Sequence, residues 1–458
     1  MLIDNFPISV QDLFNLAQTF SEEPGTCLLY SGGHYDSAQQ SFLCLFPTEF
    51  LWIQNDKLWR RKACRQRPLS YQIDNPWDSL KCLLKKGQET PYPQWVGYLG
   101  YEMGAYSDYD KKISLHRSPY PDAFFMRPSL VIIFDHHKSC GRIMLAEEYL
   151  PSAEIWLNKL RHIDEWPRTD PTGKSLDDRK SPPIKFDTLP ESEETYCRKI
   201  EKAKKLICSG DIYQINLSQK FILKGKKNPF ALFKNVVSTN PAPFTAFMQF
   251  PDFTIVSSSP ERLLSKKGCK LETRPIKGTA PRHKNQEQDR HNRETLLSSP
   301  KEQAELLMIT DLMRNDLGKI SRTGSVKTKK IWHCEGYANV FHLLSIIESE
   351  ALPHLHPLDI LRAVFPGGSI TGCPKLRAIE LIRDLEQRSR GIYTGSIGYF
   401  ASNGDFDFNI AIRTLVCQTD LIDLQLGGAI VFDSEPQKEY QEIYHKGMSL
   451  FQVLGKEI

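Results

Sequence analysis

The sequence has little that would direct the chain to a membrane or to nucleic acid. No apolar run approaches the roughly 18 residues that a membrane helix needs, and the stretch from Met1 to Asn5 lacks the basic and apolar regions of a signal peptide. The 59 basic residues barely exceed the 55 acidic ones among 458, so the net charge is only +4. We therefore expect a soluble, cytoplasmic protein with no membrane and no nucleic-acid partner.

Disulfide, zinc and phosphate-loop signatures are also missing. The eleven cysteines contain no C-x-x-C pair, and their odd number argues against a disulfide framework. Cys373 has no dedicated base nearby in the sequence, which argues against a catalytic thiol. The glycine-rich segment before it is not a phosphate loop, because Gly372 is followed by Cys373-Pro374 instead of Lys-Ser or Lys-Thr.

The composition is that of a globular protein, with 25% charged and 40% hydrophobic residues. A polar, proline-containing stretch at 166–193 predicts a linker between an N-terminal region at 1–165 and a larger unit at 194–458. In the N-terminal region, apolar runs at 27–31 and 129–134 predict buried strands, with helices at 9–20 and 152–162. That region carries little visible chemistry.

The larger unit opens with a helix expected at 194–209, followed by a strand at 211–218. In that strand Tyr213, Ile215 and Leu217 alternate with polar residues, so one face is polar enough to line a pocket. The remaining pattern predicts an α+β fold, with further strands at 244–250, 253–258, 395–401, 406–416 and 421–432, and helices at 286–317, 357–363, 374–387 and 436–453.

One lysine lies in a rigid turn, Arg274-Pro275-Ile276-Lys277-Gly278-Thr279. Pro275 restricts the backbone before Lys277, and Gly278 lets the chain turn and approach a ligand closely. Burial, or the nearby charge of Arg274, would lower the pKa of Lys277 and leave its amine unprotonated for covalent chemistry. Taken alone, the motif is more typical of a surface turn.

Four glutamates occur as two pairs spaced by three residues, Glu302 with Glu305 and Glu439 with Glu442. On helices this spacing places both carboxylates of a pair on one face. Two such faces opposite each other would make an oxygen site for Mg²⁺, and each pair alone would be a solvated helix face. Glu305 precedes the apolar run 306–309, which indicates burial on one side.

Further polar residues occupy strand ends and loops. Glu261 follows a predicted core strand, where a carboxylate could act as a general acid or base. Arg413 is expected to extend from the polar face of a strand, and Gly427 with Gly428 would offer unobstructed backbone N–H groups to an anion. His342 lies among apolar residues, which is typical of a core histidine as well as of a catalytic one.

In this order the motifs resemble those of the chorismate-utilising enzymes, which include anthranilate, isochorismate, salicylate and aminodeoxychorismate synthases. The resemblance runs from about residue 194 to 452 through GDIYQINLS, SSSPERLL, RPIKGTAPR, AELLMITDLMRNDLGKI, FPGGSITGCPKLRAIELI, RGIYTGSIGY, FNIAIRT, GGAIVFDS and EYQEIYHKG. The segments LLYSGG and VGYLGYE look like the family's N-terminal region. The resemblance to this family implies two large, mainly antiparallel sheets packed as a sandwich, with helices outside.

Within the family, two positions divide the chemistry. A lysine in PIKGT, where anthranilate synthases usually have alanine, is similar to the aminodeoxychorismate synthases. Gln214, where isochorismate and salicylate synthases usually have lysine, disfavours those two. The resemblance therefore implies that Lys277 forms a covalent adduct with chorismate and that ammonia displaces it, giving 4-amino-4-deoxychorismate for 4-aminobenzoate and folate biosynthesis.

Other roles follow from the resemblance residue by residue. Glu261 and His342 match catalytic residues, Glu305 and Glu442 match Mg²⁺ ligands, and Glu302 and Glu439 lie near the metal. The matching substrate-binding positions are Thr279, Thr371, Tyr393, Arg413, Gly427, Gly428 and Lys446. Since the sequence has no glutaminase signature, ammonia is expected from a separate glutamine amidotransferase subunit.

The family often has a tryptophan pocket, whose walls correspond here to Ser31, Pro243, Phe244 and Thr245. The sequence leaves open whether tryptophan binds. Two rival functions stay in view: an anthranilate synthase large subunit, and a non-catalytic, tryptophan-binding regulatory relative.

Overall fold

The structure is a computed structural model that describes residues 2–32, 35–63, 67–83, 90–108, 113–146, 151–160, 184–188 and 190–456. Its helices are α1 (Val10–Thr19), α2 (Pro76–Leu80), α3 (Pro151–Leu160), α4 (Glu193–Cys208), α5 (Pro229–Thr239), α6 (Gln286–Ser298), α7 (Pro300–Gly318), α8 (Pro357–Val364), α9 (Lys375–Glu386) and α10 (Pro436–Val453), with short 3-10 turns η1 (Lys81–Leu83), η2 (Tyr101–Tyr106) and η5 (Gly368–Ile370).

The strands of the N-terminal region are β1 (Leu2–Phe6), β2 (Cys27–Tyr30), β3 (Gln40–Gln54), β4 (Lys57–Lys62), β5 (Leu69–Gln72), β6 (Pro93–Leu99), β7 (Ala123–Asp135) and β8 (Cys140–Leu145). Those that follow are β9 (Lys185–Thr188), β10 (Gln214–Lys224), β11 (Phe244–Gln249), β12 (Thr254–Ser259), β13 (Arg262–Lys267), β14 (Lys270–Arg274), β15 (Ile276–Pro281), β16 (Lys327–Gly336), β17 (Val340–Glu350), β18 (Gly372–Cys373), β19 (Ser396–Ala401), β20 (Phe406–Asn409), β21 (Thr414–Cys417) and β22 (Leu421–Ile430).

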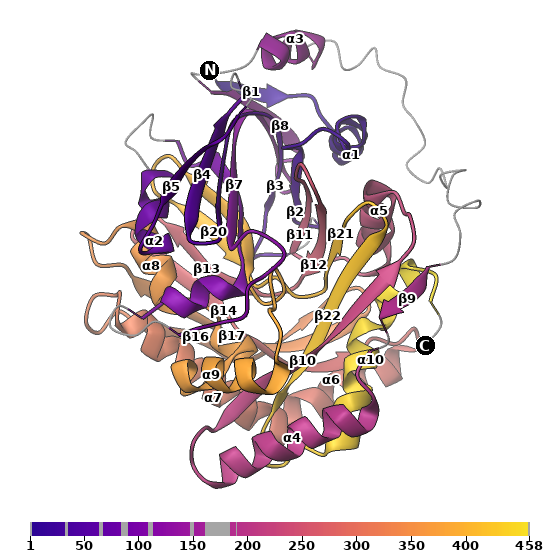
Figure 1. Cartoon of the computed structure of the whole chain (residues 1–458). Helices are drawn as coiled ribbons and strands as arrows, with labels where there is room; N and C mark the ends of the chain where they lie inside the picture. Colours follow the sequence, from indigo (N-terminus) through magenta and orange to yellow (C-terminus); the bar gives the residue numbers. More distant parts are fainter. Residues whose placement is uncertain are drawn as a thin grey trace.

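These strands form one network of antiparallel pairs with two arms (Figure 1). One arm runs β7–β3–β2–β11–β12–β21–β22–β10. The other runs β7–β6–β19–β20–β13–β14–β17, and β17 also pairs with β15 and β16. Both arms begin at β7, so the predicted pair of large antiparallel sheets is confirmed, with a hydrogen-bonded connection between them.

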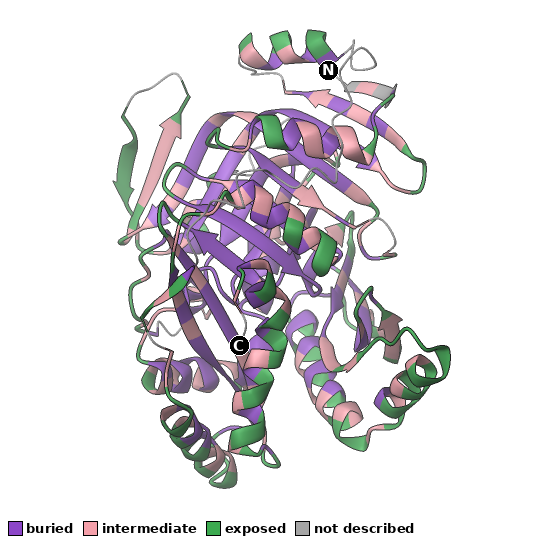
Figure 2. Ribbon diagram, turned by 90° about the vertical axis from the view of Figure 1, so that its right-hand side faces the viewer, coloured by how far each residue is buried: buried purple, intermediate pink, exposed green. Residues whose placement is uncertain are grey.

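The hydrophobic core has three large layers. Side chains of β2, β3, β6, β7, β11, β12, β19 and β21 fill the space between the arms. A second cluster lies under α1, α4, α5 and α10, and a third lies under α7, α8 and α9. Figure 2 shows the same order: buried strands lie in the centre, and the exposed residues concentrate on the outer faces of helices and at loops. The apolar stripe of α4 illustrates the cause, because Ile200 and Ala203 are fully buried on one face.

Strands of the N-terminal region pair with strands of the larger C-terminal part. β2 pairs with β11, and β6 pairs with β19 along its length. The proposed boundaries at 165 and 194 remain a prediction. Most of the expected linker, 166–183, lies outside the described residues, and its later part contains β9, which pairs with β10.

Several sequence predictions need correction. The helix expected at 286–317 is two helices, because Ser299 ends α6 and caps α7, which has Pro300 in its first turn. The strand expected at 406–416 is broken between β20 and β21, where Arg413 has a φ of 52°. Tyr213 precedes its strand and is 64% exposed. The helices at 194–209 and 436–453 are confirmed within one residue at each end.

In the described part of the chain, no helix has the length and apolar character needed to cross a bilayer.

Candidate active site

Lys277 lies on β15, beside β17. A register shift between Lys277 and Thr279 leaves Gly278 with a φ of 52°, in the left-handed region that favours glycine. A Cβ at Gly278 would approach the Glu302 carboxylate to 3.0 Å. The turn therefore sets Lys277 against α7, where its Nζ lies 3.4 Å from Glu305 Oε2 and its side chain is only 12% exposed. The surface-turn reading of this motif is wrong.

Glu261 occupies the connection between β12 and β13 and is 4% exposed. The Ser369 hydroxyl donates to its Oε1 at 2.7 Å, and the Ile276 N–H donates to the same oxygen at 3.4 Å. Burial raises the pKa of Glu261 to about 7, against the opposing effects of Ser369, Ile276 and Lys277. At neutral pH this carboxyl group can therefore both give and take a proton, as a general acid or base must.

His342 links two of the predicted substrate residues. Its Nδ1 lies 3.0 Å from Thr279 Oγ1, and Arg413 Nη2 lies 3.5 Å from its Nε2. A guanidinium only donates, so Nε2 is the acceptor and Nδ1 carries the proton. Burial, together with the charge of Arg413, lowers the pKa of His342 to about 3. The imidazole is therefore neutral at neutral pH and can polarise or hydrogen-bond a substrate group, but the imidazolium form is not populated and cannot act as a general acid.

The predicted anion-binding residues gather around β22. A Cβ at Gly427 would lie 2.8 Å from the Tyr393 hydroxyl oxygen, so glycine is what allows that ring to approach the strand. Lys446 Nζ donates to the Gly427 carbonyl at 3.3 Å, and a Cβ at Gly428 would lie 3.5 Å from the same nitrogen. Thr371 differs from these residues, since its hydroxyl donates to the Gly367 carbonyl within its own loop.

The four glutamates lie on α7 and α10, and their charges affect one another. Burial, followed by the charge of Glu305 and a contribution from Glu442, raises the pKa of Glu302. Burial, with a contribution from Glu442, also raises the pKa of Glu439. Lys446 Nζ lies 2.6 Å from Glu442 Oε1 and, with Lys277, lowers the pKa of Glu442 against the effect of burial.

This donor set suits a hard divalent cation, which prefers carboxylate oxygens. The mutual repulsion of the glutamates indicates a place where positive charge is needed. Among the described residues, however, no group of three or more Asp, Glu, His or Cys side chains is arranged to hold a metal ion. Lys277 and Lys446 supply the positive charge instead, so a metal would have to compete with these two ion pairs.

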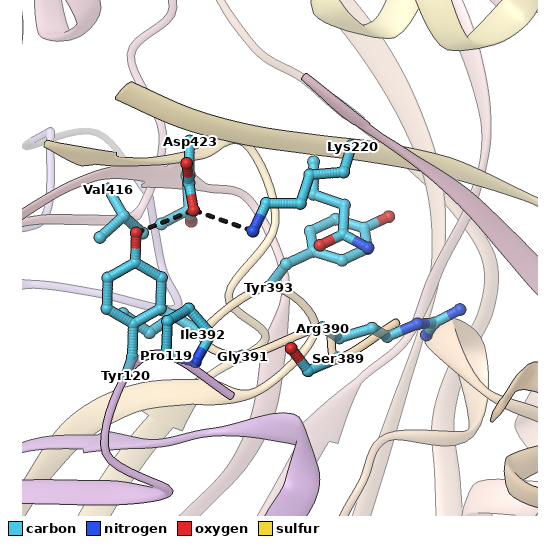
Figure 3. Close-up of a pocket in the computed structure, with 12 residues that line it drawn as sticks. Pro119, Tyr120, Lys220, Ser389, Arg390, Gly391, Ile392, Tyr393, Val416 and Asp423 are labelled. Atoms are coloured by element: carbon cyan, nitrogen blue, oxygen red, sulfur yellow. Dashed lines mark hydrogen bonds and ion pairs between the residues drawn. The ribbon is translucent and has the colours of Figure 1, made fainter. Parts of the chain in front are cut away.

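Two cavities lie near the site. The first, about 170 Å³, is lined by all four residues of the predicted tryptophan pocket and also by Asp407. The Ser31 hydroxyl there is buried and has no hydrogen-bond partner among the described residues. The second, about 20 Å³, lies behind Tyr393 (Figure 3). There Asp423 accepts from the Tyr120 hydroxyl at 2.8 Å and pairs with Lys220 at 2.9 Å.

Sequence reasoning did not identify two residues with direct links to this site. Ser369 lies in the segment FPGGSITGCPK but was not assigned a role, although its hydroxyl donates to Glu261. Arg390 lies in RGIYTGSIGY, three residues before Tyr393, and its guanidinium lies 5.8 Å from the ring of that tyrosine. Both residues could have been identified from the sequence only by their position within a family motif.

A buried lysine and glutamate, next to groups that bind anions, define an enzyme site for a small carboxylate substrate. Comparison with known proteins specifies that class: residues 47–452 match the family described as chorismate binding enzyme, and the chain belongs to this family of chorismate-utilising enzymes. Aminodeoxychorismate synthase component 1 of Bacillus subtilis is 37% identical over 361 residues, 78% of this chain and 76% of that protein.

Anthranilate synthases are similar to the same degree. Anthranilate synthase component 1 of Acetivibrio thermocellus is 30% identical over 453 residues, which cover 94% of this chain and 91% of that protein. The crystal structure of anthranilate synthase component I from Streptococcus pneumoniae superimposes with a TM-score of 0.78 at 32% identity, covering 92% of this chain and 93% of that one. Overall similarity therefore establishes a chorismate-utilising enzyme and leaves its product to be argued from the site.

The contact between Ser369 and Glu261 predicts a specific pH dependence. Activity that requires protonated Glu261 should decline as the pH rises through about 7. Ser369→Ala removes a hydroxyl that favours the charged carboxylate, so the apparent pKa should rise by about one unit, whereas Ser369→Thr should keep the original value. The measurement is the pH profile of kcat/KM for chorismate. Overlapping profiles for Ser369→Ala and the unmodified protein would contradict this role.

Proposed function

We propose that this chain converts chorismate and ammonia to 4-amino-4-deoxychorismate, the reaction of aminodeoxychorismate synthase component I. The observation that carries the proposal is the placement of Lys277. It is shielded from solvent and next to Glu305, and its neighbour Ile276 donates to Glu261. A nucleophile and a proton donor are thus held side by side. Relatives of both activities have similar identities, so the support for the first activity comes from this lysine.

In the first half of the proposed reaction, the unprotonated amine of Lys277 forms a bond to C2 of chorismate. Glu305 is the carboxylate within reach to take the proton of Lys277 beforehand. Both ring double bonds shift, from C1=C2 and C5=C6 to C1=C6 and C4=C5, the C4–O bond breaks, and the departing hydroxyl takes a proton from Glu261 and leaves as water. Burial suits Glu261 to this task because it raises the pKa to about 7.

In the second half, ammonia forms a bond to C4, both ring double bonds shift back to C5=C6 and C1=C2, and the C2–N bond to Lys277 breaks. The sum is chorismate plus ammonia to 4-amino-4-deoxychorismate plus water. Arg413, Tyr393, Gly427 and Lys446 would hold the two carboxylates of the ring substrate, with Thr279, Thr371 and Gly428 beside them. Neutral His342, between Thr279 and Arg413, would hydrogen-bond the substrate without competing for protons.

The second candidate is anthranilate synthase component I. The high coverage of the Acetivibrio thermocellus relative and the fold of the Streptococcus pneumoniae structure favour it. That reaction adds ammonia at C2 and eliminates pyruvate, and a lysine nucleophile has no part in it. We also propose that a separate glutamine amidotransferase subunit supplies the ammonia, since the relatives are named as component 1. Free ammonium should replace that subunit in vitro.

Product identity tests this proposal. With chorismate, Mg²⁺ and ammonium, mass analysis should detect 4-amino-4-deoxychorismate, and Lys277→Ala should lower its rate of formation at least 100-fold, in the range expected when a covalent nucleophile is lost. Lys301→Ala is the matched control, because Lys301 approaches the same Glu305 at 4.0 Å but is 55% exposed. It should change the rate less than about threefold. Anthranilate as the product, or an unaffected Lys277→Ala variant, would overturn the assignment.

We further propose that the enzyme requires Mg²⁺, held by Glu305 and Glu442 with Glu302 and Glu439 in support. Bound Mg²⁺ would neutralise and orient the C1 carboxylate of chorismate. The supporting observation is the mutual charge effect among these carboxylates across α7 and α10. Substrate carboxylates would supply the remaining oxygen ligands, as is usual for Mg²⁺.

The metal proposal predicts the behaviour of glutamine variants. In the presence of chorismate, Glu305→Gln and Glu442→Gln should each weaken Mn²⁺ binding at least about tenfold, as measured from the magnetic resonance signal of free Mn²⁺. Glu348→Gln, on β17, provides the control, since that carboxylate pairs with Lys270 near the surface. Equal Mn²⁺ affinity in all three variants would show that Glu305 and Glu442 do not bind the metal.

Finally, we propose that the cavity of about 170 Å³ at Ser31 binds L-tryptophan. Phe244 and Pro243 supply apolar walls. The Ser31 hydroxyl, which is unpaired among the described residues, and the Asp407 carboxylate supply polar partners for an amino acid. Calorimetry should detect binding to the unmodified protein. Ser31→Ala should weaken it about three- to tenfold, the value of one hydrogen bond, and Ser238→Ala on the surface of α5 should leave it unchanged. Absence of binding at millimolar tryptophan would refute this proposal.

A further inference from the structure

Arg390 is a fully buried arginine in the connection between α9 and β19. Its side chain and that of Glu386 are each 1% exposed. Nε and Nη2 donate to the two carboxylate oxygens of Glu386 at 3.1 and 2.7 Å, in the bidentate arrangement that suits a guanidinium. The charge of Arg390 is thereby neutralised, and several N–H groups remain for other partners.

Those groups reach the chain segments that carry predicted substrate residues. Nη1 donates at 3.0 Å to the carbonyl of Ile370, directly before Thr371. Nη2 donates at 2.8 Å to the carbonyl of Asn216 on β10. Nη1 also lies 3.3 Å from Thr394 Oγ1, directly after Tyr393. One guanidinium therefore connects the Thr371 loop, the Tyr393 loop and the strand beside β22.

Glu386 extends this connection to the glycine strand. Its Oε1 accepts from both the N–H and the hydroxyl of Ser218 at 2.8 Å. Ser218 pairs with Gly427 in the register of β10 and β22. On the other side, the Tyr101 ring lies 4.7 Å from the guanidinium and closes the cluster. Figure 3 shows Arg390 extending away from the cavity that Lys220 and Asp423 line, on the far side of Tyr393 from Asp423.

A buried ion pair of this kind is weak evidence for stability, because desolvation offsets most of the Coulomb attraction. What the planar guanidinium provides is fixed geometry, since its donors cannot move independently. A lysine could keep the charge beside Glu386, but it could not hold Ile370, Asn216 and Thr394 at the same time. The arrangement therefore constrains where three separate segments meet.

We propose that Arg390 is a positioning residue that sets the mutual placement of Thr371, Tyr393 and Gly427 for chorismate binding. It acts through those residues and does not touch the substrate. The proposal rests on the substrate-binding roles given to them under Proposed function. A displacement of about 1 Å in such groups can reduce turnover by as much as 100-fold.

The test compares two buried arginines. Arg390→Lys should raise the KM for chorismate at least tenfold and change the KM for ammonium less than twofold. Arg362→Lys is the control: Arg362 is equally buried and donates to the backbone carbonyls of Ser107 and Asp108, outside the three segments. It should lower the melting temperature but leave the KM for chorismate unchanged. Chorismate consumption is followed by absorbance, so the result does not depend on which amino product forms.

Two outcomes would overturn the proposal: an unchanged chorismate KM in Arg390→Lys, or equal increases in both variants. If Arg390→Lys does not fold, Tyr101→Leu replaces it, because that change removes the ring beside the guanidinium and leaves the hydrogen bonds in place. It should raise the chorismate KM about threefold, and an unchanged KM would again count against the role. If the unmodified protein does not consume chorismate, the same comparison is made on chorismate affinity by calorimetry.

Discussion

The constraint on which this structure depends is that a charge removed from water must be paired. Lys277 pairs with Glu305 and Arg390 with Glu386 in largely buried surroundings, whereas Lys446 and Glu442 form a half-exposed pair on α10. Under the proposed function, a substrate with two carboxylates and a divalent cation would offer new counter-charges to the Lys277 and Lys446 pairs. The Arg390 pair would keep its partner and hold its surroundings in place. The pairs of Lys277 and Lys446 thus differ from that of Arg390, because a ligand would replace a partner only in the first two.

Glu261 follows a different solution to the same constraint. Among the described residues it forms no ion pair, so burial raises its pKa, and the hydrogen bond from Ser369 and the charge of Lys277 limit that rise. Its neighbour Arg262 is buried and paired with Asp407 and Glu272, and Glu272 also accepts from Arg274. Since Asp407 lines the cavity at Ser31, a continuous set of charges joins that cavity to the strand that leads to Lys277.

Local sequence patterns predicted the long helices at 194–209 and 436–453, because amphipathic periodicity is a local property. The two antiparallel sheets were predicted from the family resemblance instead. Local patterns missed the break at Ser299 because the polar pattern of α6 continues into α7, although Pro300 was a usable signal. They missed the turn at Arg413, where nothing local marks a positive φ. Ser369 and Arg390 act on partners 108 and 174 residues away, Glu261 and Asn216, and no local pattern contains such distances.

The pairing of β2 with β11 and of β6 with β19 has a consequence for how the protein is made. Tyr30 meets Thr245 roughly 200 residues later, and Leu99 meets Ser396 roughly 300 residues later. During synthesis β2 and β6 leave the ribosome long before their partners β11 and β19 are made, so one edge of each strand stays unpaired until then. Assembly of the sandwich is therefore a late event that needs nearly the whole chain, and the first hundred residues are the part most exposed to aggregation until then.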